Sequence, residues 1–174
     1  GTIDEVAPTL DAVVIVVVNA AQTEAVLFGE NGIAQKLAAG TVVVACATVA
    51  PDMARDLAAR CEAHGLLYLD APVSGGTLRA GDGSLSILAA GSAQAFEKAR
   101  PALNAMSERV FELGEDVGTG SSMKAARSMV SMARSTPSSV TPSCRRWRTS
   151  RAARKGSAIR PAMTPGAFGG TPRA

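Results

Sequence analysis

The chain has 174 residues, of which 47% are hydrophobic and 3% aromatic, and its formal net charge is +3. This length fits one ordinary domain, with a core expected to consist of aliphatic side chains. Three cysteines without C-x-x-C spacing and a single histidine indicate neither a disulfide framework nor a metal site. No apolar run approaches the ~18 residues of a membrane span and no basic-then-apolar leader is found, so we expect no membrane association and a cytoplasmic location.

Apolar segments and helical patterns alternate along the first part of the chain. Three strands are expected, the first of them apolar on both faces and therefore interpreted as a central strand of a parallel sheet: residues 12–18, 41–46 and 66–69. A short helix is expected from Thr23. A longer one is expected from Pro51 to about Ala63, and its buried face should hold Met53, Leu57, Ala58 and Cys61.

The pattern continues with elements that extend the same sheet. Residues 84–90 alternate as in a strand with one buried face, residues 93–106 predict a helix, and residues 109–113 a last strand. Gly118 and Gly120 then open a helix that carries Lys124. The order predicts an α/β fold, a partial Rossmann-like, doubly wound parallel sheet with crossover helices.

The stretch from Asp70 to Gly83, D-A-P-V-S-G-G-T-L-R-A-G-D-G, follows the third expected strand. Ser74, Gly75 and Gly76 place a hydroxyl beside two residues that adopt positive φ readily, an arrangement suited to holding a carboxylate. A Gly-rich surface turn is the simpler interpretation of S-G-G alone. The length of the stretch makes the signal more specific.

These fourteen residues resemble the substrate-binding signature of the β-hydroxyacid dehydrogenases, which include 3-hydroxyisobutyrate, tartronate semialdehyde and threonate dehydrogenases. Gly118, Gly120 and Lys124 resemble the start of the same family's G-x-G-x-x-x-K catalytic helix. The resemblance covers roughly residues 11–124, and the segment V-V-N-A-A-Q-T-E-A-V-L-F-G looks most like the threonate branch.

The resemblance implies an NAD- or NADP-dependent oxidoreductase that removes a hydride from a small hydroxy acid. It implies that Lys124 is the catalytic base, in place of an ordinary solvated lysine, and that Ser74, Gly75 and Gly76 hold the substrate. It also implies a set of cofactor-binding residues: Thr48, Val17, Val18 and Gln22. An ordinary turn or helix cap remains the alternative for Thr48.

The sequence departs from the family in two places. The G-x-G-x-x-G turn that holds the cofactor pyrophosphate is not found, so roughly the first two β-α units of the family are expected to be absent. Arg127 and Ser128 stand where the family commonly places amide side chains that orient the substrate. The family's helical domain, which often forms a homo-oligomer, is also expected to be missing.

The composition changes after about residue 125. Residues 1–116 hold 7 Lys/Arg and 15 Asp/Glu, whereas residues 117–174 hold 11 Lys/Arg and no acid. We therefore divide the chain into a partial NAD(P)-binding domain (1–117), the start of an interdomain helix (118–130) and an Arg/Ser/Pro-rich tail (131–174). The tail is expected to be disordered or irregular, and translated out of frame or otherwise foreign to the fold.

Three functions stay open at this point. The first is the dehydrogenase, the second a non-catalytic truncated remnant of that enzyme, and the third a module whose basic tail binds nucleic acid. We favour the first and regard nucleic-acid binding as the weakest. Metal ligands are not expected in any of them.

Overall fold

The computed structural model describes residues 1–135, with side chains described to Met129. Expectations for the tail beyond residue 135 lie outside the described residues. The described elements follow the order α1 (Ile3–Val6), η1 (Ala7–Thr9), β1 (Ala12–Ile15), α2 (Ala20–Phe28), β2 (Val42–Ala45), α3 (Pro51–Ala63), β3 (Leu67–Asp70), β4 (Val73–Ser74), α4 (Gly76–Gly81), β5 (Leu85–Gly91), α5 (Ala93–Met106), β6 (Ser107–Glu112) and α6 (Thr119–Ser135).

The strands form one six-stranded, mostly parallel sheet in the order β1-β2-β3-β5-β4, with β6 on the other side of β5. β1, β2 and β3 are parallel, and β6 is parallel to β5, as a doubly wound α/β fold requires. β5 runs antiparallel to β3 and β4. The expected α/β, Rossmann-like class is therefore confirmed, and the sheet departs from the predicted parallel arrangement where β5 pairs with β3 and β4.

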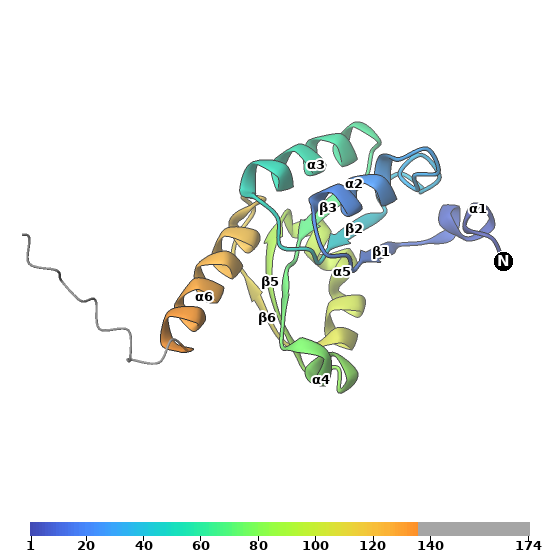
Figure 1. Ribbon diagram of the computed structural model, residues 1–174. Coiled ribbons are helices and arrows are strands. Elements are labelled where there is room, and N and C mark those ends of the chain that lie inside the picture. The colour runs from blue at the N-terminus through green and yellow to red at the C-terminus, as the bar shows by residue number, and fades with distance from the viewer. Residues whose placement is uncertain (136–174) are drawn as a thin grey trace, which may run out of the picture. The chain divides into compact units, whose positions relative to one another are not determined.

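Helices cover the sheet on both sides, with α2 and α3 on one side of the strands and α5 on the other (Figure 1). Alternate residues of each strand point to opposite faces. Val43, Ala45 and Tyr68 thus pack under α2 and α3, whereas Val44 and Leu69 pack against α5. Because both faces of the sheet are covered here, all four residues of β2 are buried, which explains why residues 42–45 are all apolar.

The first strand differs from its prediction. β1 ends at Ile15 and, in the described part of the chain, pairs only with β2, so it is an edge strand and not a central one. Val16 is 70% and Val18 80% exposed. The β-branched run therefore extends beyond the strand, and Val16 and Val18 belong to the loop that follows β1.

Two further differences concern which side chains are buried. α3 has the predicted bounds, but Met53 is 38% exposed and Ala54 takes its place on the buried face. Ala54 lies at the centre of the face formed by Leu57, Ala58 and Cys61, whereas Met53 lies about 100° away at the edge of that face. β5 is buried along six of its seven residues and not on one face only, because α5 and α6 cover its two faces.

In residues 1–135, no helix is both long and apolar enough to cross a membrane, and no three His, Cys, Asp or Glu side chains are grouped as metal ligands would be. Cys46 and Cys61 are free and buried.

Candidate functional site

The loops that carry the predicted site residues leave the sheet at one edge. The register aligns Ile15 with Ala45 and Ala45 with Asp70, and these are the last residues of β1, β2 and β3. Because the strands are parallel, the segments that follow start at the same level, outside the carboxyl ends. Ligands bind at this position in open α/β sheets.

Asp70 joins this edge to the helix that carries Lys124. Its carboxylate is 1% exposed and accepts hydrogen bonds from the Gly118 N–H (3.1 Å), the Ser121 N–H (2.9 Å) and the Ser121 hydroxyl (2.7 Å). These N–H groups belong to the start of α6, where backbone donors have no partner within the helix. A carboxylate also interacts favourably with the positive end of the helix dipole.

Burial raises the pKa of Asp70, and the hydrogen bonds from Ser121 and Gly118 oppose that rise. The Ser121 hydroxyl accepts a further hydrogen bond from the Val49 N–H (3.4 Å). Ser121 therefore connects the segment after β2 to the end of β3.

Both glycines of the G-T-G segment are required by packing. Gly118 has φ +100°, and a Cβ there would lie 2.9 Å from the Pro51 carbonyl oxygen. At Gly120 a Cβ would lie 2.5 Å from the Leu88 oxygen and 2.7 Å from the Asp70 oxygen. The resemblance to a catalytic helix thus has a structural reason: the backbone of α6 approaches β3 and β5 too closely for a side chain.

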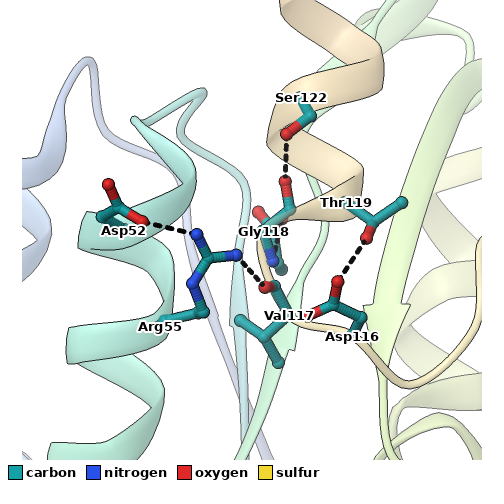
Figure 2. A network of polar contacts seen from close by, with 8 residues as sticks. Asp52, Arg55, Asp116, Val117, Gly118, Thr119 and Ser122 are labelled. Carbon is teal, nitrogen blue, oxygen red and sulfur yellow. Dashed lines mark hydrogen bonds and ion pairs between the residues drawn. The ribbon is translucent and has the colours of Figure 1, made fainter.

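A second set of polar contacts holds the segment before α6 against α3. Arg55 donates to the Val117 carbonyl oxygen and forms an ion pair with Asp52, and Thr119 donates to the Asp116 carboxylate, as Figure 2 shows. These hydrogen bonds and the ion pair are exposed to solvent, so they contribute little stability individually.

Ser74 lies on the face of the sheet that α6 covers. β4 pairs antiparallel with β5 and places Ser74 opposite Ser86, so that both side chains are on the same face. Ser86 lines a pocket together with Arg127 of α6, which identifies that face as the one beneath α6. The Ser74 side chain is half-buried there.

Lys124 lies on the side of α6 nearer β3. Ser121, three residues earlier, binds Asp70 of β3, whereas Met123 lines a pocket with Phe111 of β6. Residues three apart on a helix share a side, so Lys124 lies with Ser121 and away from Met123. β4 pairs with β5 as β3 does, so Ser74 lies on the face of the sheet that α6 covers, and Lys124 belongs to that helix.

The environment of Lys124 favours its neutral form. Its side chain is half-buried, and its pKa lies below the ordinary lysine value, mainly because burial disfavours the charged ammonium and further because Arg127 carries the same charge. A neutral amine at this position accepts a proton, as a general base must.

Gly75 and Gly76 both have positive φ, +146° and +70°, as their sequence predicts. Both residues are exposed, but the backbone of Gly75 is also in close contact with the side chain of Arg79. A Cβ at Gly75 would lie 2.8 Å from Cβ and 2.9 Å from Cδ of Arg79, so the Arg79 stem passes directly over this glycine. α4 occupies part of the expected Gly-rich turn.

The predicted cofactor residues lie in the loops at the carboxyl edge. Thr48 and Val18 are exposed after β2 and β1, and Val17 is partly buried in the core beneath α2 and α3. Gln22 has a structural role, since its side chain accepts from the Val18 N–H (2.9 Å) while its own N–H donates to Asn19 (3.0 Å), which caps α2.

These loops fit the nicotinamide half of a dinucleotide, because they offer exposed apolar and hydroxyl side chains at the edge where such cofactors bind. The residues that hold a pyrophosphate in this fold class, a G-x-G-x-x-G turn, are not found in the 174 residues.

Sequence reasoning missed Asp70 and Ser121 as functional residues. Asp70 opens the recognised stretch, yet an acid at the end of an apolar strand does not indicate its partner. The available signal was the position of Ser121, the third residue of α6, because the first backbone N–H groups of a helix need an acceptor from outside the helix.

Comparisons with known proteins agree with this geometry. Residues 1–114 match the NAD binding domain of 6-phosphogluconate dehydrogenase. An L-threonate dehydrogenase from Haemophilus influenzae is 51% identical over 115 residues, which cover 66% of this chain and 38% of that protein. A 3-hydroxyisobutyrate dehydrogenase from Pseudomonas aeruginosa is 39% identical over 107 residues, 62% of this chain and 36% of that protein.

A solved structure of 3-hydroxyisobutyrate dehydrogenase from Salmonella typhimurium superposes with a TM-score of 0.71 at 37% identity, covering 75% of this chain and 45% of that one. The chain thus spans less than half the length of these relatives.

Proposed function

Because the chain belongs to the family of the NAD binding domain of 6-phosphogluconate dehydrogenase, and with it to the β-hydroxyacid dehydrogenases, we propose that it serves an oxidoreductase that takes a hydride from a small hydroxy acid. The proposed hydride acceptor is NAD or NADP. What supports this proposal is that Ser74 pairs with Ser86, which lines a pocket beneath α6, and that Lys124 of α6 has a lowered pKa.

Each residue has a distinct task in this proposal. The Ser74 hydroxyl and the backbone of Gly75 and Gly76 hold the substrate carboxylate. Lys124, whose pKa is lowered by burial and by Arg127, accepts the proton of the substrate hydroxyl at Nζ in its neutral form as the carbonyl forms. Asp70 is a positioning residue, since it holds the first turn of α6 and so fixes where Lys124 lies.

The cofactor, when bound, supplies a nicotinamide ring that accepts the hydride from the carbinol carbon. Thr48, Val17 and Val18 would lie along its nicotinamide half. Gln22 supports this surface indirectly through the Val18 backbone.

The substrate class follows from the relatives, whose names specify L-threonate and 3-hydroxyisobutyrate. Both acids are short, so one molecule contacts Ser74 and Lys124 together only if these two side chains lie close to each other. We therefore propose a small aliphatic hydroxy acid with a carboxylate close to the reacting hydroxyl.

A turnover assay tests the proposal. The purified full chain is incubated with L-threonate or 3-hydroxyisobutyrate and either NAD or NADP, and reduced nicotinamide is measured. Lys124→Ala should lower turnover by about 10²–10⁴-fold, the usual loss of a general base. Lys36→Ala, which removes a lysine that pairs with Asp4 far from this face, should leave turnover unchanged.

Equal turnover in the two variants would refute the role of Lys124. Absence of turnover in a chain that still binds reduced nicotinamide would favour the non-catalytic alternative.

A further inference from the structure

Beside the proposed site lies a polar pocket of about 290 Å³ that the mechanism does not use. Four elements contribute its lining: Arg79 of α4, Ser86 of β5, Glu108, Arg109 and Phe111 of β6, and Arg127 of α6. Three guanidinium groups and one carboxylate give it a formal charge of +2.

The pocket is continuous with the residues that are proposed to hold the substrate. Ser86 is the cross-strand partner of Ser74, and in the next strand Arg109 is the partner of Ser86. The three side chains therefore form one row across the face beneath α6. Ser74 is thus one strand away from Ser86, which lines the arginine pocket.

Two of the arginines are also connected to the site through their own contacts. The stem of Arg79 crosses Gly75 at a distance that excludes any Cβ there. Arg127 is close enough to Lys124 for its charge to lower the pKa of that lysine. Arg79 and Arg127 thus connect the pocket to Gly75 and to Lys124, respectively.

The positive charge of the pocket is not neutralised by the protein. Among the described residues, Arg79, Arg109 and Arg127 form no ion pair, and Glu108 pairs with none of them. The sequence after Asp116 contains no Asp or Glu that could pair with Arg127. Three cations beside a single carboxylate leave an excess of positive charge, and a bound anion relieves the repulsion among them.

We propose that the Arg79–Arg109–Arg127 pocket binds a second, distal oxyanion of the substrate, which is then a hydroxy acid with two anionic groups. Guanidinium groups bind carboxylate and phosphate in the same bidentate manner, so the distal group is one of these two. The inference rests on the proposed function for the placement of the first carboxylate at Ser74. The lining and the charge of the arginine pocket do not depend on whether the protein transfers a hydride.

Calorimetric binding to the full chain, without turnover, tests the inference. The ligands are glycerate, its 3-phosphate ester, and the dicarboxylate tartrate, all at one ionic strength. At least one of the two dianionic acids should bind 10-fold or more tightly than glycerate, and the tighter one identifies the distal group as phosphate or carboxylate. Equal affinity for all three acids would overturn the inference.

Variants separate a specific pocket from general attraction by positive charge. Arg109→Gln should abolish the preference for the dianionic acid, and Arg109→Lys should retain part of it. Arg100→Gln is the matched control, since Arg100 is also exposed beside β6 but pairs with Glu112 on the face that α5 covers. An equal loss of preference in the control would overturn the inference, and melting curves of each variant establish that it is folded.

The outcome is distinct from that of the turnover assay. A preference for dianionic acids that depends on Arg109 supports the arginine pocket even if no hydride is transferred. Turnover that depends on Lys124 supports the proposed function even if all three acids bind equally.

Discussion

The carboxylate of Asp70 accepts hydrogen bonds from both the N–H and the hydroxyl of Ser121, which lies 51 residues later in the chain. This pair attaches the first turn of α6 to the end of β3. Lys124 is one turn further along the same helix, so the position of the proposed base depends on a buried acid that has no part in the chemistry. The first predictions follow from this arrangement.

Replacing Asp70 by Asn should destabilise the fold by about 1–3 kcal/mol, because an amide oxygen replaces a carboxylate that accepts three hydrogen bonds. The folded state raises the pKa of Asp70, so it binds the proton more tightly than the unfolded state. Protonated Asp70 therefore adds to the free energy of unfolding. This contribution is fully present below pH 3.8, the ordinary pKa of an aspartic acid, and it is lost as the pH rises through the pKa of Asp70 in the folded state.

The difference in free energy of unfolding between the native chain and Asp70→Asn should therefore narrow as the pH rises, in urea titrations between pH 4 and 7. The exposed Asp82→Asn, which removes one carboxyl group elsewhere on the chain, serves as the control. A difference that widens with pH would contradict the account of Asp70.

Replacing Gly120 by Ala should lower stability by roughly 2 kcal/mol or more, since the added methyl overlaps the carbonyl oxygens of Leu88 and Asp70. Gly81→Ala is a matched control in α4, where a Cβ meets nothing within 4 Å. Urea midpoints of the two variants measure the effect. Equal midpoints would show that α6 does not pack against β3 and β5 as closely as described.

Replacing Arg127 by Gln should raise the pKa of Lys124, because it removes a like charge that disfavours the ammonium. Burial, the larger cause, remains, so the pKa should stay below the ordinary lysine value. Titration of the labelled lysine side chain by NMR measures the shift, and Arg100→Gln is the control on the other face. A pKa that falls or does not move in Arg127→Gln would be inconsistent with the proximity of the two cations.

In a Cys144→Ser chain, the two remaining thiols should resist modification at pH 8. Burial raises the pKa of Cys46 to about 11 and that of Cys61 to about 12, and only 5% and 0% of these residues are exposed. The thiolate, which is the reactive form, is then about one part in a thousand or fewer. A disulfide reagent should react with both thiols in guanidinium chloride and with neither in buffer; rapid reaction in buffer would contradict the packing of β2 and α3.

Local patterns in the sequence predicted local structure well. The bounds of α3 and the burial of β2 follow from the Pro that starts the helix and from an unbroken β-branched run. Positive φ at Gly75 and Gly76 was expected from residue type alone. The phase error at Met53 arose because Met and Ala are both apolar, and only the contacts decide which of them faces the sheet.

Long-range relationships were not predictable in the same way. The antiparallel direction of β5 depends on the connection through β4 and α4, for which the sequence shows only a Gly-rich turn. The exposure of Val16 and Val18 depends on where β1 ends. The partners of Asp70 lie 48 and 51 residues later in the chain, and Arg109 and Arg127 meet Ser86 from later elements, β6 and α6. No spacing in the sequence marks these contacts.

The central claim is that one small hydroxy acid contacts both Ser74 and Lys124. The most direct test is an NMR titration of the full chain with L-threonate that follows the backbone amides of Gly75 and Gly76 and the side chain of Lys124 together. The account predicts that all three signals shift with the same Kd, and that Ser74→Ala weakens the response at Lys124 as well. Signals that saturate at different concentrations, or a Lys124 signal that does not respond, would contradict it.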